Sequence, residues 1–121
     1  MSDSVTRVRE ICLALPETTE RPSHGAPTFF VRDKRSFATV WDSHHGDGRF
    51  ALVCPAPAGM QATLVEAEPE RFYVPPYFGH RGWIGVRLDL TPDWEEIADL
   101  VFESYCMTAP KRLLQALART D

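Results

Sequence analysis

The run of residues 82–88 constrains the fold of this chain more than any other segment. Its side chains fall into two alternating sets, Ile84, Val86 and Leu88 in one and Trp83, Gly85 and Arg87 in the other. A strand with this alternation turns its aliphatic set to one side and the second set to the other. The pattern is typical of a sheet with one face covered by helices and one face at least partly open. We expect the Trp83 indole to lie on the uncovered face.

The remaining sequence predicts both helices and strands. Apolar spacing predicts helices over 4–15 and 57–66, and strands are expected over 28–32, 36–41, 50–54 and 72–74. Thr91 followed by Pro92 predicts the start of a third helix, because threonine caps helices and proline favours the first helical position. A last short helix is expected from Ala109, and the polar segment 18–24 is expected to be a link.

These elements define the expected fold class. Their order is α-β-β-β-α-β-β-α with one further helix, and the chain of 121 residues has room for one core. We therefore expect a single α+β domain over residues 1–121. It should have two layers, with a largely antiparallel five-stranded sheet and helices on one face.

Composition narrows the class of partner. The net charge is -4, from 17 acidic and 13 basic residues, which argues against a broad basic surface for nucleic acid but permits a local basic patch.

The cysteines and the absence of targeting signals bear on the compartment. Cys12, Cys54 and Cys106 are odd in number and lie in apolar runs, as reduced core thiols do. The first residues lack the pattern of a signal peptide, and no apolar run is long enough for a membrane span. We expect a cytoplasmic protein with no membrane partner.

A series of short motifs gives the chain a family resemblance. In order they are Leu15-Pro16, Gly25-x-Pro27-x-Phe29-Phe30-Val31, Pro69-Glu70-x-Phe72, Pro76-Tyr77, Gly82-Trp83, Val86-Arg87-Leu88, Ser104-Tyr105 and Ala109-Pro110-Lys111-Arg112-Leu113. Together they resemble the MmcQ/YjbR-like proteins, which are small bacterial cytosolic proteins. The resemblance implies a two-layer domain with an antiparallel sheet. It also implies DNA as a partner, because members are often labelled DNA-binding from a proposed double-wing arrangement of hairpins.

Basic residues supply the candidate DNA contacts. Arg32, Lys34 and Arg35 surround the tip of the first predicted hairpin, where a DNA wing needs cations for phosphate groups. Arg49, Arg87, Lys111 and Arg112 complete the candidate set. The second wing would be the loop 42–49, in which Arg49 is the only fixed cation.

Aromatic residues offer a different working surface. Trp83, with Gly85 and Arg87 beside it, would form an apolar plate next to a cation, suited to stacking of a planar group. Two alternatives to DNA follow. The first is a protein–protein or homodimer interface at Trp83. The second is a small-molecule-binding protein or enzyme with a pocket near His24, Tyr77, Trp83 and Tyr105.

Catalytic and metal-binding templates are missing from the sequence. There is no Gly-x-Ser-x-Gly elbow, P-loop or His-Glu-x-x-His helix, and the histidines and cysteines lack metal-ligand spacing. We therefore expect a binding protein rather than an enzyme, with no catalytic residues, metal or cofactor.

Overall fold

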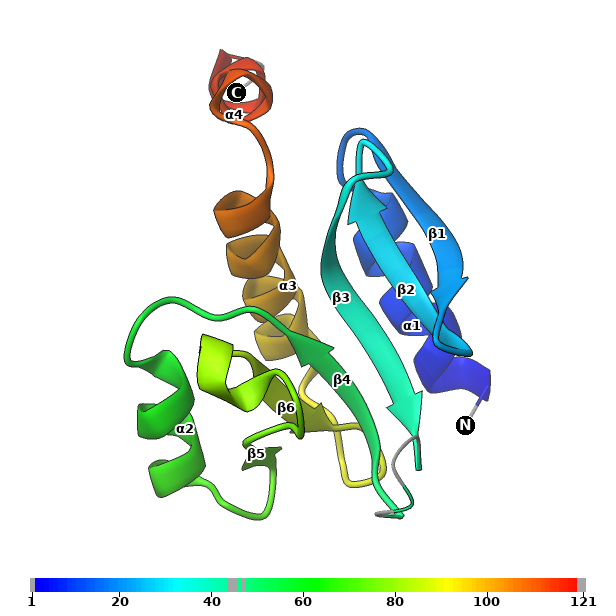
Figure 1. Cartoon of the computed structure of the whole chain (residues 1–121), viewed down its shortest axis with the longest axis vertical. Coiled ribbons are helices and arrows are strands. Elements are labelled where there is room, and N and C mark those ends of the chain that lie inside the picture. The colour runs from blue at the N-terminus through cyan, green and yellow to red at the C-terminus, as the bar shows by residue number, and fades with distance from the viewer. Residues whose placement is uncertain (1, 44–45, 47, 120–121) are drawn as a thin grey trace.

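A computed structural model describes residues 2–43, 46 and 48–119 (Figure 1). Its helices are α1 (Ser2–Leu13), α2 (Met60–Ala67), α3 (Trp94–Thr108) and α4 (Lys111–Arg119), with a 3₁₀ turn η1 (Gly79–Arg81). Its strands are β1 (Thr18–Ser23), β2 (Ala26–Val31), β3 (Arg35–Asp42), β4 (Phe50–Cys54), β5 (Phe72–Tyr73) and β6 (Ile84–Arg87). Within these described residues, the strands form one antiparallel sheet in the order β1-β2-β3-β4-β6-β5. The predicted α+β class with an antiparallel sheet is confirmed.

The sheet has a strand that the sequence did not predict. β1 occupies the polar segment expected to be a link, and it pairs with β2 from Thr18↔Val31 to Ser23↔Ala26. It lies at the edge of the sheet, where polar side chains and Pro22 are tolerated because one side of the strand needs no partner. The Arg9 guanidinium on α1 binds the Glu20 carboxylate through two contacts of 2.6 and 3.0 Å. The expected count of five strands is therefore wrong, because the described residues form a sheet of six.

Turn geometry positions the first two strands. His24 and Gly25 connect β1 to β2 with φ angles of 52° and 82°, the left-handed pair typical of a two-residue type I′ hairpin. A register shift between Phe29 and Phe30 interrupts the ladder between β2 and β3. This bulge brings apolar residues of both parities under cover, which explains why strict alternation is lost in this hairpin.

Apolar residues pack on both faces of the sheet. The helices cover one face, and their residues join a cluster that includes Ile84, Val86 and Leu88. In Figure 1, α1 and α3 lie behind the strands. A smaller cluster of Ala26, Trp41, Val53 and Trp83, with Phe78 packed on it, occupies the opposite face. Trp83 therefore lies on the helix-free side of β6, as the alternation predicts.

All four helix starts differ from the sequence prediction, those of α1 and α4 by two residues and those of α2 and α3 by three. α3 begins at Trp94, because the Asp93 side chain caps it by accepting a hydrogen bond from the Glu96 amide. The predicted start at Thr91 is wrong, and Pro92 precedes the cap. α2 begins at Met60 rather than at residue 57, after a turn in which the Met60 amide donates to the Pro57 carbonyl.

The middle of the sheet is open at one end. β3 and β4 pair only from Thr39↔Val53 to Asp42↔Phe50, although β3 begins at Arg35. β4 ends at Cys54, and the next residue, Pro55, has no amide hydrogen to continue the ladder. The two strands diverge beyond this point (Figure 1). We call the opening between residues 35–38 and Pro55 the strand split.

Candidate functional site

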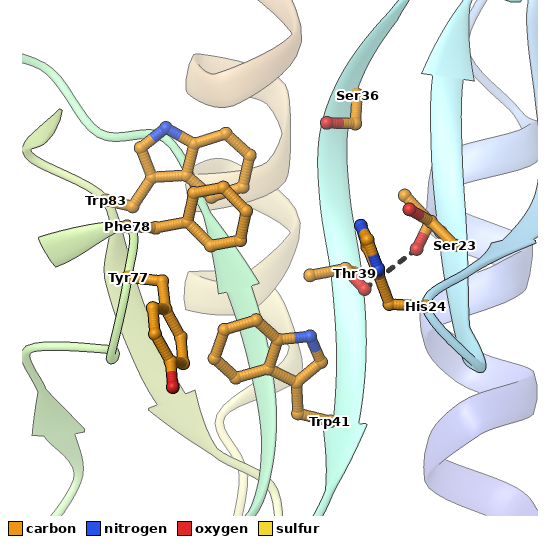
Figure 2. Close-up of a pocket in the computed structure, with 9 residues that line it drawn as sticks. Ser23, His24, Ser36, Thr39, Trp41, Tyr77, Phe78 and Trp83 are labelled. Carbon is orange, nitrogen blue, oxygen red and sulfur yellow. Dashed lines mark hydrogen bonds between the residues drawn. The ribbon is translucent and has the colours of Figure 1, made fainter. Parts of the chain in front are cut away.

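A cavity of about 360 Å³ opens on the helix-free face (Figure 2). Its lining residues are Ser23, His24, Thr28, Ser36, Thr39, Trp41, Tyr77, Phe78 and Trp83. We call it the aromatic cavity. The lining residues come from the β1–β2 hairpin, from β3 and from the segment before β6, so the fold brings together residues up to sixty positions apart. The volume is within the range of small-ligand pockets.

Aromatic rings form one wall of the aromatic cavity. Phe78 stacks on Trp83 with ring centroids 4.6 Å apart and an interplanar angle of 19°. Trp41 lies 5.9 Å from Phe78 at 33°. Because Phe78 covers it, Trp83 is only 6% exposed. Trp83 therefore lies on the predicted face of the sheet, and Phe78 covers its ring there.

The expected plate beside Trp83 does not form. The Tyr73 ring fills the space over Gly85, and a Cβ at residue 85 would collide with it. Arg49 lies over the same ring, 4.1 Å from its centroid. Arg87 forms an ion pair of 2.8 Å with Asp89. These contacts close the surface that the sequence predicted to be an apolar plate next to a cation.

Polar groups form the opposite wall of the aromatic cavity. The Thr28 and Thr39 hydroxyls lie 2.9 Å apart, and they contact the backbone carbonyls of Ala26 at 3.0 Å and Pro27 at 3.1 Å. Two hydroxyl hydrogens serve these three contacts, so acceptor capacity remains for another group. Figure 2 shows His24 and Ser36 on the same side, across from the rings. A flat apolar wall facing hydrogen-bonding groups suits a planar molecule with polar substituents.

One side chain fixes the aromatic wall. Gln61 on α2 donates from its amide nitrogen to the carbonyls of Gly79, at 2.9 Å, and Trp83, at 2.6 Å. It therefore ties both ends of the η1 segment to α2 and holds Phe78 over Trp83. These bonds span 18 and 22 positions, so no local pattern indicates them.

The predicted pocket residues do not all meet. His24, Tyr77 and Trp83 line the aromatic cavity, whereas Tyr105 lies in the cluster on the helix-covered face. The Tyr105 hydroxyl donates to the Pro16 carbonyl at 2.8 Å, and burial raises the pKa of this phenol. Sequence reasoning missed Trp41 and Phe78 as wall residues. Alternation of Thr39 and Trp41 in β3 was the available signal for Trp41.

The candidate DNA contacts are dispersed. Arg32 binds Glu17 at 2.7 Å, and this hydrogen bond lowers the pKa of the Glu17 carboxyl. Lys111 and Arg112 are exposed at the start of α4. Residues 44, 45 and 47 of the expected second wing lie outside the described residues. DNA binding and self-association both stay predictions.

Two of the hairpin cations line a second hollow of about 410 Å³ at the strand split. Its lining residues are Lys34, Arg35, Ser36, Pro55, Arg81, Trp83, Met107 and Thr108. We call it the cationic hollow. Arg81, from η1, joins the hairpin cations in this hollow.

In the part of the chain that the structure describes, no group of three or more His, Cys, Asp or Glu side chains is placed to hold a metal ion. No helix among the same residues has the length and apolar character needed to cross a bilayer.

Comparison with known proteins identifies the family. Residues 13–107 match the family model of YjbR. The chain belongs to the YjbR family. The match contains every residue that lines the aromatic cavity, so the site lies within the YjbR domain itself.

A solved structure supports the YjbR fold. The crystal structure of protein DR2400 of Deinococcus radiodurans, with a domain labelled DUF419, aligns with a TM-score of 0.73. The alignment covers 94% of this chain and 87% of that chain at 20% sequence identity, which establishes a shared fold. No curated protein matches the chain.

Proposed function

We propose that this YjbR-family chain is a binding protein for a small planar molecule, which it holds in the aromatic cavity. The observation that carries the proposal is the Phe78–Trp83 stack, with Trp41 beside it, facing the hydroxyls of Thr28 and Thr39. A ring inserted along this wall gains stacking contacts, and its polar edge meets hydrogen-bonding groups.

Preorganisation supports this function. Trp41 and Trp83 are 5% and 6% exposed, and Gln61 fixes the backbone that carries the Trp83 ring. These rings are already ordered, so they lose little conformational entropy when a ligand binds. More of the free energy gained from contacts with the ligand therefore appears as affinity.

The positions of the three tryptophans provide a direct test. Trp41 and Trp83 line the aromatic cavity, whereas Trp94 begins α3 and carries Arg7 at 5.0 Å from its ring centroid. In protein labelled with 5-fluorotryptophan, a panel of planar heteroaromatic compounds should contain members that shift the fluorine resonances of Trp41 and Trp83. The Trp94 resonance, assigned by Trp94→Phe, is the internal control. A panel without any such compound, or hits that shift Trp94 equally, would refute the proposal.

An isosteric variant then tests the polar wall. Thr39→Val removes a hydroxyl from the aromatic cavity and should weaken binding of a hit about five- to tenfold, the effect of one lost hydrogen bond. Thr6→Val, on the exposed surface of α1, is the matched control and should leave affinity unchanged. Equal affinities for the two variants would remove the hydroxyl wall from the site.

Duplex DNA is the second candidate, and the observation that favours it is the meeting of Lys34, Arg35 and Arg81 in the cationic hollow. Binding would be salt-sensitive and would weaken in a Lys34→Gln/Arg35→Gln variant. A gel mobility assay at low salt tests this. The absence of a shift at micromolar protein rejects DNA as the partner.

A further inference from the structure

The cationic hollow is built by three separate parts of the fold. Lys34 and Arg35 come from the turn before β3 and its first residue, Arg81 from η1, and Met107 and Thr108 from the end of α3. These parts meet because β3 and β4 separate at Pro55 and leave the strand split between them. The hollow is therefore a consequence of sheet topology rather than a chance gap between loops.

The cations of the cationic hollow have no acidic partner among the described residues. Among the residues that the structure describes, no carboxylate forms an ion pair with Lys34, Arg35 or Arg81, and none lines the hollow. Arg32, in the same hairpin, differs because it binds Glu17. The carboxyl end of α3, at Thr108, brings a partial negative charge of about half an elementary charge, which offsets only part of three formal positive charges.

The cationic hollow adjoins the aromatic cavity. Ser36 and Trp83 line both spaces. The Arg81 guanidinium lies 5.6 Å from the Phe78 ring centroid and 5.5 Å from that of Trp83, so the cation adjoins the stacked pair itself. A group bound at the cations is therefore within reach of a ring bound along the aromatic wall.

We infer that the cationic hollow binds the anionic group of the molecule whose ring occupies the aromatic cavity. The inference rests on the proposed function and specifies its ligand class, a planar aromatic compound that carries a phosphate or carboxylate. Arginine suits this role because its guanidinium binds such anions through paired N–H donors and also packs on aromatic rings. The strand split lets one ligand use both spaces.

Matched probes separate the two contributions. We would titrate the full chain by calorimetry with 2-naphthol, 2-naphthyl phosphate and inorganic phosphate at low ionic strength. 2-Naphthyl phosphate should bind at least about tenfold more tightly than either 2-naphthol or inorganic phosphate. The gain over 2-naphthol should shrink as salt is added, because exposed charges are screened.

Variants assign the gain to the cations. Lys34→Gln/Arg35→Gln should remove most of the advantage of 2-naphthyl phosphate while leaving 2-naphthol affinity within about twofold. Arg81→Gln should also remove most of that advantage. Arg32→Gln is the matched control, because it neutralises a cation of the same hairpin that lies outside the cationic hollow. It should retain the advantage.

Each contrary result has a distinct meaning. Equal affinity for 2-naphthol and 2-naphthyl phosphate, or an equal loss in Arg32→Gln, overturns the anion site and leaves the ring site standing. Inorganic phosphate that binds as tightly as 2-naphthyl phosphate overturns the joint ligand. Failure of 2-naphthol and 2-naphthyl phosphate to bind overturns the inference, and the heteroaromatic panel then decides the proposed function separately.

Discussion

Replacing Gln61 by glutamate should loosen the aromatic wall without changing the size of the side chain. The Gln61 amide nitrogen donates both of its hydrogens, to the carbonyls of Gly79 and Trp83. A carboxylate in its place turns two hydrogen bonds into two contacts between oxygen atoms. Each lost bond to a partly buried carbonyl costs about 1 to 1.5 kcal/mol, so Gln61→Glu should lower the free energy of unfolding by about 2 to 3 kcal/mol at pH 8.

The loss should be pH-dependent, with a definite sign. Burial beside two carbonyls favours the protonated form of the introduced carboxyl group, so its pKa in the folded state should lie above the ordinary value of about 4.3. A raised folded-state pKa means that the protonated acid stabilises the fold at low pH, and that this stabilisation is lost as pH rises. Because the protonated carboxyl group donates one hydrogen, about half of the destabilisation should disappear at pH 4.

Urea unfolding of Gln61→Glu and wild type at pH 8 and pH 4 measures the loss of stability and its partial recovery at low pH. Comparing the two proteins at each pH removes the pH dependence that the wild type itself shows. Gln115→Glu, at an exposed position on α4, is the matched control for the added charge. Ligand affinity should also fall in Gln61→Glu. If Gln61→Glu and Gln115→Glu differ by less than about 0.5 kcal/mol at pH 8, or if the difference is constant with pH, Gln61 does not hold the aromatic wall.

Three further predictions concern the scaffold. Gly85→Ala should lower the free energy of unfolding by about 1 to 3 kcal/mol, because the added Cβ collides with the Tyr73 ring. Tyr73→Val should relieve part of that cost in a double-mutant cycle. Strictly additive losses in the two variants would contradict the collision. Burial raises the pKa of Cys54 from 9.0 to about 11. The contribution of this thiol to the free energy of unfolding is therefore complete below pH 9 and falls by up to about 3 kcal/mol as pH rises through 11. Cys54→Ala should therefore flatten the alkaline part of a stability–pH curve, and an unchanged slope would contradict this. Tyr105→Phe should cost about 1 kcal/mol in chemical denaturation by removing the bond to the Pro16 carbonyl, with cavity binding unchanged.

The sequence predicted those parts of the fold that leave a local pattern. Alternation in residues 82–88 placed Trp83 on the correct face. Successive side chains of a strand point to opposite faces of the sheet, and the two faces carry different apolar clusters. β1 left no such apolar pattern, since an edge strand needs few apolar residues. Its best local signal was the His24-Gly25 pair, which forms the tight turn into β2.

The site was only partly predictable because its contacts join distant segments. Tyr77 has a left-handed backbone, with φ of 69°, in the turn that carries Phe78 back over Trp83. Nothing in the local sequence indicates that direction, since tyrosine is unusual in this conformation. Tyr105 was misplaced for a related reason. Its helix faces the far side of the sheet, and helical periodicity alone does not say which side a helix covers.

The division of the apolar residues between two faces has a consequence for how such a protein diversifies. The larger cluster, under the helices, sets cooperative folding, whereas the smaller one, with Trp41 and Trp83, shapes the aromatic cavity. The sheet backbone stands between them, so a change of ring size or hydroxyl on one side transmits little strain to the other. The residues that line the aromatic cavity can therefore change during evolution without loss of the fold. A small library of substitutions at Ser36 and Thr39 could alter ligand preference in the same way.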